Sequence, residues 1–185
     1  MPHSHKGIDG EILPVVTIGL PVFNSENSIK DAIESIINQS FQNWELVISD
    51  NNSIDDTVEI IEQFVKLDKR IFLYKQIENI GMYSNFDFVL KKSRGEYFHW
   101  LAADDKRSID FLSENISFLD RHSDFVASCS QKFFGSAKKD QKNNVNFSLE
   151  QTTAKERIDY LLNNIWQSHS IYYSVIRTQI IKKCQ

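Results

Sequence analysis

Two adjacent carboxylates, Asp104 and Asp105, follow directly after a run of bulky apolar and aromatic residues, 96–101 ("EYFHWL"). Side by side the two charges repel, and the repulsion is relieved when a divalent cation binds between them and a ligand. A set of oxygen ligands favours Mg²⁺ or Mn²⁺ over zinc. The pair therefore predicts a divalent-metal site, with capping of the following helix as the structural alternative.

Polar residues also follow two other short apolar runs. Asn24 and Glu26 come after the run 14–20, and Asp50 comes directly after 45–49. Each of these residues alone is explained equally well as a turn former or helix cap. If the runs are parallel strands, however, their carboxyl ends share one edge of a sheet, and ligands bind in the crevice at that edge. We therefore expect these residues and the acidic pair to meet in one cleft.

The elements that must position these residues alternate between two periodicities. Short β-branched or aromatic runs are typical of buried strands, and between them apolar residues recur at helical spacing, as in 29–37. This alternation indicates an α/β fold with a largely parallel central sheet flanked by helices, because right-handed crossovers return each strand to the same direction. The predicted strands are 14–20, 45–49, 70–74, 96–101, 124–128 and 170–176, and the predicted helices include 29–37, 58–65, 86–90, 108–121 and 154–162.

Capping residues predict where three of these helices begin or end. Asn24 or Ser25 is a candidate N-cap for the first helix, and Ser53 with Asp56 three residues later resembles a capping box for the second. Gly95 fits the C′ position after the third helix.

The composition is that of one globular domain with a sizeable core. The chain has 185 residues, of which 41% are hydrophobic, and a formal net charge of −4, so it has no basic surface for nucleic acid. Cys129 and Cys184 provide neither a disulfide framework nor a zinc cluster, which predicts a cytoplasmic protein. His99 lies among aromatic residues within a predicted strand, where a structural role is expected. No apolar run is long enough for a signal peptide or a membrane-spanning segment.

Several common nucleotide-binding classes are excluded by the turn after the first predicted strand. A dinucleotide-binding fold needs G-x-G-x-x-G there, so that the backbone can approach a pyrophosphate, and "GLPVFN" has no such glycines. The chain also has no G-x-x-x-x-G-K-[ST] phosphate loop and no Gly-rich, Arg-containing loop of the kind that a nucleotidyltransferase uses.

Four segments in order resemble the family 2 glycosyltransferases, which have the GT-A fold, a Rossmann-like α/β sheet. They are "TIGLPVFNSE" (17–26), "WELVISDNNSIDDT" (44–57), "NIGMYSNFDFVL" (79–90) and "GEYFHWLAADD" (95–105). Each segment alone is a weak signal, but four in order at the family's spacing are a strong one. The resemblance implies a nucleotide-sugar donor, a UDP- or dTDP-sugar, and inverting hexosyl transfer to the hydroxyl of a saccharide or lipid-linked acceptor in surface polysaccharide synthesis.

The resemblance also implies roles for individual residues. Asp50 matches the aspartate that pairs with the base, and Asp104 matches the last aspartate of the D-x-D motif, which reaches a Mn²⁺ or Mg²⁺ ion, with Asp105 directly behind it. The segment that lines the nucleoside corresponds to Pro21, Val22, Phe23, Asn24 and Glu26. The segment beside the ribose and diphosphate corresponds to Asn79, Gly81 and Asn85, and Ala103 is the middle residue of the D-x-D motif.

Two departures from the family pattern weaken the catalytic assignment. Ala102 replaces the first aspartate of D-x-D, so its contact is lost or moved to Asp105. The family's catalytic base lies farther downstream than this chain extends past Asp104, which predicts a chain truncated at its C-terminus with the base beyond Gln185. Candidate substitutes for the base, which no spacing distinguishes, are Glu156, Asp159 and His169.

The expected organisation is a disordered start, 1–13, followed by a GT-A-like domain over 14–185. Within that domain we expect a nucleotide-sugar-binding part at 14–130 and an incomplete acceptor part at 131–185. The expected location is the cytoplasm, or the inner face of the membrane as a peripheral protein. The alternative function is a truncated, non-catalytic nucleotide-binding module that lacks the base.

Overall fold

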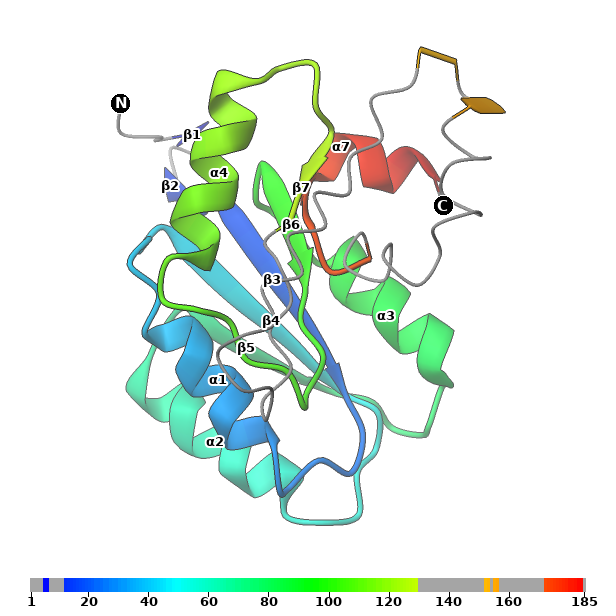
Figure 1. The fold of residues 1–185 in the computed structure, drawn as a ribbon. Coiled ribbons are helices and arrows are strands. Elements are labelled where there is room, and N and C mark those ends of the chain that lie inside the picture. Colours follow the sequence, from blue (N-terminus) through cyan, green and yellow to red (C-terminus); the bar gives the residue numbers. More distant parts are fainter. Residues whose placement is uncertain (1–4, 7–11, 130–151, 154, 157–171, 185) are drawn as a thin grey trace, which may run out of the picture.

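The computed structural model describes residues 5–6, 12–129, 152–153, 155–156 and 172–184, and its centre is a six-stranded sheet in the order β5-β4-β3-β6-β8-β7 (Figure 1). The pairs β5-β4, β4-β3 and β3-β6 are parallel, whereas β8 runs antiparallel to both β6 and β7. The predicted α/β class with a largely parallel sheet is confirmed. The strands are β3 (Val16–Val22), β4 (Trp44–Asp50), β5 (Ile71–Lys75), β6 (Tyr97–Trp100), β7 (Ala127–Ser128) and β8 (Val175–Arg177).

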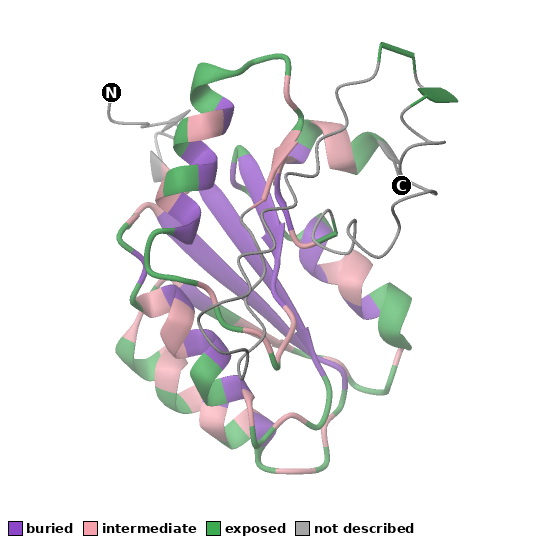
Figure 2. Ribbon diagram, viewed as in Figure 1, coloured by how far each residue is buried: buried purple, intermediate pink, exposed green. Residues whose placement is uncertain are grey.

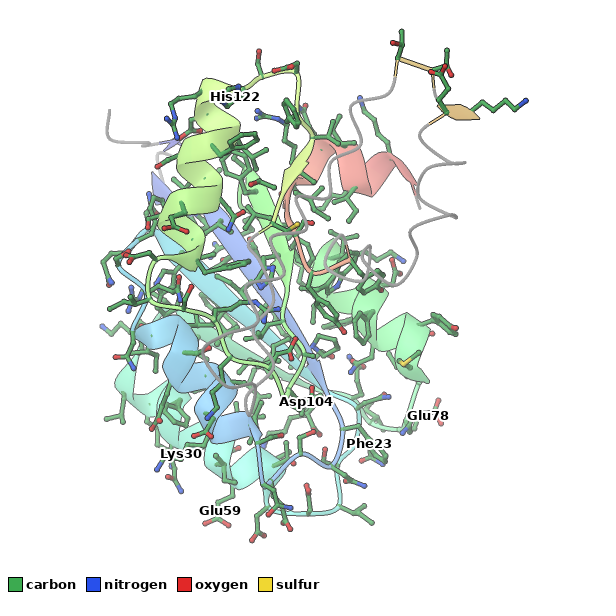
Figure 3. All side chains as sticks on the ribbon, in the orientation of Figure 1. Phe23, Lys30, Glu59, Glu78, Asp104 and His122 are labelled. Carbon is green, nitrogen blue, oxygen red and sulfur yellow. The ribbon has the colours of Figure 1, made fainter. Side chains whose placement is uncertain are left out.

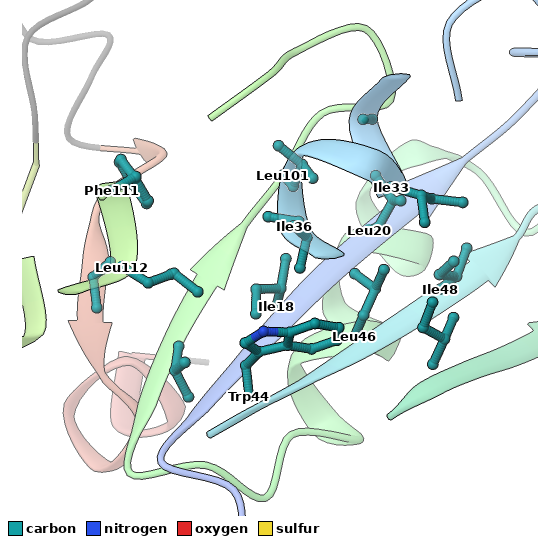
Figure 4. Packing of buried hydrophobic residues seen from close by; sticks show 14 of the residues in the cluster. Ile18, Leu20, Ile33, Ile36, Trp44, Leu46, Ile48, Leu101, Phe111 and Leu112 are labelled. Atoms are coloured by element: carbon teal, nitrogen blue, oxygen red, sulfur yellow. The ribbon is translucent and has the colours of Figure 1, made fainter. Parts of the chain in front are cut away.

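Helices cover both faces of this sheet. Apolar residues of α1, α2 and α4 pack with one face in a large core, and residues of α3 and α7 pack with the other face in a smaller one (Figures 1 and 2). Every residue of β3 and β4 is buried, because helices cover the sheet on both sides. Figure 4 shows how Ile33 and Ile36 of α1 lie over Ile18 and Leu46 of the central strands. The helices are α1 (Ile29–Ile37), α2 (Thr57–Leu67), α3 (Met82–Lys91), α4 (Phe111–Arg121) and α7 (Thr178–Ile181), followed by the 3-10 turn η1 (Lys182–Cys184).

Element positions agree with the sequence pattern in the first two thirds of the chain. The helix predicted at 29–37 is α1, and the first four predicted strands correspond to β3, β4, β5 and β6. The strand predicted at 124–128 is shorter, since only Ala127–Ser128 pairs with β8. The helix predicted at 154–162 lies mostly outside the described residues.

The start of the chain contains a second, two-stranded sheet. In it β1 (His5–Lys6) pairs antiparallel with β2 (Ile12–Leu13), within the range expected to be a disordered start. The division of the chain into a start, a nucleotide-sugar-binding part and an acceptor part stays a prediction. None of the helices in the described part of the chain combines the length and apolar composition that crossing a membrane requires.

The predicted helix caps at Asn24, Ser25 and Ser53 are wrong. The N-cap residue of α1 is Ser28 and that of α2 is Asp56, and neither makes a side-chain capping bond. The polar side chains before these helices instead bond across to the neighbouring loop, as described below for the site.

Gly95 is also not the C′ residue of α3, which ends at Lys91 with Lys92 as its C-cap. A Cβ atom on Gly95 would lie 2.6 Å from the Thr17 amide nitrogen and 2.8 Å from the Tyr97 carbonyl oxygen. Close packing of backbone at the start of β6 therefore requires glycine at this position.

Candidate functional site

The carboxyl ends of the parallel strands bring the predicted site residues to one edge of the sheet. Val22 at the end of β3 is in register with Asp50 at the end of β4, and Gly19 of β3 is in register with Trp100, the last residue of β6. In Figure 3 the labelled Phe23 and Asp104 lie at this end of the sheet, and His122 lies at the other. The expectation that the strand ends converge is confirmed.

A pocket of about 340 Å³ opens at this edge, beside the N-terminal turns of α3. Five of the predicted binding residues line it, and the first and last of them, Pro21 and Asn85, are 64 positions apart in the sequence. The predicted residues Asp50, Gly81, Ala103 and Asp104 do not line it. Asn51, which directly follows Asp50 and was expected at this edge, lines the pocket as well, and so do Met82 and Phe86, which the sequence did not assign to the site. The full lining is Pro21, Val22, Phe23, Asn51, Asn79, Met82, Asn85 and Phe86.

Helical spacing could have identified two of the missed residues. Met82 and Phe86 are four positions apart in α3, on the face that also presents Asn85. Once Asn85 is assigned to the pocket, Met82 and Phe86 follow as its neighbours on one helix face.

Asp50 is the most deeply buried acidic residue of the site, with 2% of its surface exposed. Its Oδ2 accepts a hydrogen bond from the Ser53 amide at 3.0 Å. Its Oδ1 has no hydrogen-bond partner among the described residues. A buried carboxylate oxygen without a partner is costly, and a hydrogen-bond donor that reached it beside the pocket-lining Asn51 would relieve that cost.

Asparagine side chains hold the loop between β5 and α3 against the end of β4. Asn51 donates from Nδ2 to Asn79 Oδ1 at 3.0 Å and accepts from the Ile80 amide at 2.9 Å. Asn79 Oδ1 also accepts from the Gly81 amide at 2.9 Å. Gly81, at φ +83°, has the left-handed conformation that only glycine adopts readily. These bonds fix the N-terminal end of α3 beside the pocket.

Asn85 crosses from α3 to β4, where its Nδ2 donates to the Ser49 carbonyl oxygen at 3.0 Å. Its Oδ1 is buried and has no hydrogen-bond partner in the described part of the chain. The pocket-lining Asn85 thus has a buried acceptor without a partner, as does Asp50, which lies next to the pocket-lining Asn51.

Asn24 and Glu26 are near the pocket but do not line it. Asn24, at φ 47°, accepts the Ile54 amide on its Oδ1 at 3.0 Å, and Glu26 accepts the Asp56 amide on its Oε2 at 3.2 Å. Both side chains therefore join the loop after β3 to the loop after β4. This bonding favours a supporting role, in which they shape the pocket wall formed by Phe23.

The two carboxylates after β6 have different surroundings. Asp104 is exposed and makes no hydrogen bond or salt bridge with the described residues, while Ala102 and Ala103 are partly buried. Asp105 faces the Arg107 guanidinium, with Oδ2 at 3.4 Å from Nη1. The Arg107 guanidinium, which the sequence pattern did not predict here, thus offsets part of the charge repulsion on which the predicted metal site rests.

No cluster of three or more His, Cys, Asp or Glu side chains that could hold a metal occurs among the residues the structure describes. A metal at Asp104 would need further ligands from a bound diphosphate and water. The exposed carboxylate fits such a shared site, because Mg²⁺ and Mn²⁺ commonly keep waters and phosphate oxygens as ligands.

Arg107 is held in turn by His99, which is fully buried within β6. The Arg107 Nε donates to His99 Nε2 at 3.0 Å, and His99 Nδ1 lies 3.3 Å from the Ser174 carbonyl oxygen. This pattern requires the neutral tautomer with hydrogen on Nδ1. The structural role expected for His99 agrees with this geometry.

Acid is expected to destabilise the fold through His99. Burial holds the pKa of His99 well below its usual range, and Arg107 lowers it further. The unfolded chain takes up a proton near about pH 6.5, so this stability is complete above that pH and falls below it by at most about 1.4 kcal/mol per pH unit. Urea unfolding at several pH values between about 7.5 and 5 should show a smaller loss for His99→Asn than for the parent. Equal slopes for the two proteins would contradict this prediction.

Glycosyltransferases are similar to this chain in sequence. The family model described as "Glycosyl transferase family 2" matches residues 17–184. A putative teichuronic acid biosynthesis glycosyltransferase, TuaG of Bacillus subtilis, is 32% identical over 66% of this chain and 46% of its own. An uncharacterized glycosyltransferase of Haemophilus influenzae is 35% identical over 58% of this chain and 43% of its own. The chain thus spans less than half the length of these two relatives.

Solved structures share the fold at low sequence identity. S. aureus TarS in complex with UDP-GlcNAc matches with a TM-score of 0.71 and 20% identity, over 91% of this chain and 47% of that one. The mannosyltransferase PcManGT from Pyrobaculum calidifontis, in complex with GDP-Man and Mn²⁺, matches with a TM-score of 0.58 and 22% identity, over 65% of this chain and 36% of that one.

Proposed function

The chain belongs to glycosyl transferase family 2, and from that membership we propose that it binds a uridine or thymidine diphosphate sugar. The sugar is transferred, with inversion, to an acceptor hydroxyl during synthesis of a bacterial surface polysaccharide. TuaG, named for teichuronic acid biosynthesis, supports the polysaccharide, and the TarS complex with UDP-GlcNAc supports the uridine donor.

The buried, unpartnered Oδ1 of Asp50 is the observation that carries this proposal. A carboxylate can only accept hydrogen bonds, and the N3–H group of uracil or thymine is a donor. Cytosine has an acceptor at that position, so a cytidine donor fits Asp50 poorly. The pocket of about 340 Å³ beside Asn51 provides space for the nucleotide.

A divalent metal is the second part of the proposal. Asp104 is the carboxylate that would hold it, because it is exposed at the end of β6 and has no bonded partner among the described residues. When bound, the ion offsets the negative charge that develops on the departing nucleoside diphosphate. Arg107 contacts Asp105, the next residue in the chain, and offsets part of its charge. The Mn²⁺ in the PcManGT complex supports this choice of cofactor.

Inversion also requires a base that takes the proton of the acceptor hydroxyl. Of the three candidates, Asp159 and His169 lie outside the described residues. Glu156 accepts the Thr153 amide at 3.0 Å and donates its own amide to Thr153 Oγ1 at 3.2 Å, which is a capping box. This local role disfavours Glu156 as the base.

Calorimetric titration with UDP, with and without Mn²⁺, tests the proposal. The parent should bind UDP more tightly with the metal, and incubation with UDP-sugars should then distinguish a transferase from a module that only binds nucleotide. Absence of binding at millimolar UDP would contradict both the transferase and the nucleotide-binding module.

Asp104→Ala is expected to remove the metal dependence of UDP binding, with a loss of at least about tenfold in the Mn²⁺-dependent affinity. Ala102→Asp should preserve or strengthen that dependence, because it restores a second carboxylate. The control is Asp124→Ala, which removes an exposed carboxylate beyond α4. If Asp104→Ala binds UDP and Mn²⁺ as the parent does, the metal assignment is wrong.

A further inference from the structure

Three aromatic rings pack together beside the candidate pocket, and two of them form a stack. The Trp100 and Tyr172 rings are nearly parallel, at 10°, with centroids 5.0 Å apart. Phe86 supports both, with centroid distances of 6.3 Å to Trp100 and 6.0 Å to Tyr172. The Trp100 Nε1 donates to the Phe86 carbonyl oxygen at 3.2 Å, which fixes the indole. The Tyr172 ring therefore packs on an indole whose orientation is fixed.

Tyr172 is the open end of this stack. Trp100 is only 8% exposed, whereas Tyr172 is 48% exposed. Trp100 covers one face of the Tyr172 ring, and the Tyr173 ring packs against it with centroids 5.5 Å apart, yet about half of the Tyr172 surface stays open to solvent. A large aromatic face held in a fixed orientation but left open to solvent is suited to stacking against a ligand.

The stack is continuous with the pocket through Phe86, which lines the pocket and contacts both other rings. Tyr172 precedes β8, which lies on the far side of β6 from β3 and β4, where the pocket is. The next residue, Tyr173, lies near the acidic pair: burial raises the pKa of its phenol, and the charges of Asp105 and Asp104 raise it further. The open ring face is thus next to the region where the proposed sugar transfer takes place.

We propose that the exposed face of Tyr172 stacks against a pyranose ring of the acceptor saccharide. This inference rests on the proposed function and specifies its acceptor as a sugar. The weakly positive C–H groups on one face of a pyranose complement the negative face of an aromatic ring, and the phenol provides a polar partner for sugar hydroxyls.

Tyr83 makes an acceptor a better match than the donor sugar. It is 83% exposed in the first turn of α3. Burial is the main cause that raises the pKa of the Tyr172 phenol, followed by Tyr173 and then by Tyr83. The contribution of Tyr83 indicates that it lies near Tyr172. Two exposed tyrosines near each other fit consecutive rings of an oligosaccharide better than the single ring of a donor.

The test uses saturation-transfer NMR with chitotetraose, cellotetraose and maltotetraose as probes, each with and without UDP and Mn²⁺. At least one probe should show transfer to its ring C–H protons in the parent protein. Tyr172→Ala and Tyr172→Leu should raise the Kd for that probe by roughly five- to tenfold, while Tyr172→Phe, which keeps the ring, should stay within about twofold.

Leu67→Ala is the matched control, because Leu67 is an apolar side chain that is 85% exposed at the end of α2. It should leave saccharide binding unchanged. Circular dichroism establishes that each variant is folded, and rescue by Tyr172→Phe separates ring stacking from a folding defect.

The inference is overturned if no probe binds the parent, or if Tyr172→Ala and Tyr172→Leu bind the probe as tightly as the parent does. It is also overturned if Tyr172→Ala weakens UDP-GlcNAc relative to UDP while saccharide binding is unchanged, because the ring would then serve the donor. Failure of the parent to bind UDP contradicts the proposed function instead, and the titrations without UDP keep the two results separate.

Discussion

Replacing Asp50 with alanine is expected to weaken UDP binding by about 10- to 100-fold, the factor that corresponds to a hydrogen bond with a charged partner of about 1.5–3 kcal/mol. The Asp50 Oδ1 is buried and has no partner among the described residues, so a nucleobase N–H would satisfy it without displacing an existing bond. The other oxygen, Oδ2, is held by the Ser53 amide, which keeps the carboxylate in place before a ligand binds. Calorimetry with UDP in the presence of Mn²⁺ measures the effect.

The Asp50→Asn variant gives a sharper test, because it changes the hydrogen-bonding pattern with little change in shape. Its Oδ1 can still accept from Ser53, but its amide group then presents a donor where the carboxylate presented an acceptor. We expect a lower affinity for UDP and a higher ratio of CDP to UDP binding than in the parent. The ligand-free variant should be at least as stable as the parent, because a neutral amide replaces a buried carboxylate charge.

Asp124→Asn is the control for these measurements, because it removes an exposed charge in the loop after α4. It should bind UDP as the parent does. The assignment of Asp50 fails if Asp50→Ala and Asp124→Asn have the same affinity for UDP, or if Asp50→Asn leaves the preference for UDP over CDP unchanged.

The sheet and the convergence of its polar edge could be predicted from the sequence, because both depend on local periodicity. The stripe from Ile29 to Ile37 predicted α1 within its observed bounds, and the apolar run before Asp50 predicted β4. Because β3 and β4 are parallel, Val22 and Asp50 lie at the same edge of the sheet irrespective of the conformation of the loops.

The bonding in the loops could not be predicted, since it joins residues far apart in the sequence. Asn24 accepts from Ile54, 30 positions away, instead of capping α1, and Ser53 Oγ accepts from the Asn24 amide instead of capping α2. A short polar side chain before a helix is compatible with either arrangement. Only the spatial proximity of the two loops decides between them.

Arg107 shows a similar limit at the acidic pair. The adjacent charges of Asp104 and Asp105 were a sound reason to expect a cation, but a guanidinium two positions beyond Asp105 offsets part of that charge. The position of Arg107 depends on His99 and on the Ser174 carbonyl, which is 75 positions from His99 in the chain. The sequence could therefore predict that a positive charge lies near the acidic pair, but not that the Arg107 side chain supplies part of it.

Replacing Arg94 with methionine is expected to lower the free energy of unfolding by about 2–4 kcal/mol, somewhat less than the loss of a partner from a fully buried ion pair. The Glu45 side chain is only 4% exposed, and Arg94 bonds to its Oε2 at 2.9 Å through Nε and at 2.6 Å through Nη2. The Arg94 side chain is 40% exposed, which screens the pair and reduces the expected loss. Urea unfolding at neutral pH measures the change.

The matched control is Lys75→Met, which breaks the salt bridge between Lys75 and Glu62, whose side chains are 52% and 42% exposed. It should cost less than about 1 kcal/mol, because water solvates the partner that remains. Combining Arg94→Met with Glu45→Gln should recover part of the stability, since the uncompensated buried charge is then removed. Equal losses for Arg94→Met and Lys75→Met would contradict the prediction.

This network also predicts a separation of stability from binding. Glu45 accepts from Thr17 Oγ1 at 2.6 Å, and the Arg94 and Gly95 amides donate to Thr17 Oγ1 at 3.1 and 2.9 Å, so the network joins β3 and β4 to the residues before β6. All of these bonds lie at the amino ends of the parallel strands, whereas the pocket lies at their carboxyl ends. The Arg94→Met variant should therefore bind UDP with the affinity of the parent under conditions in which it is fully folded. A weaker affinity under those conditions would show that the two ends of the sheet are coupled.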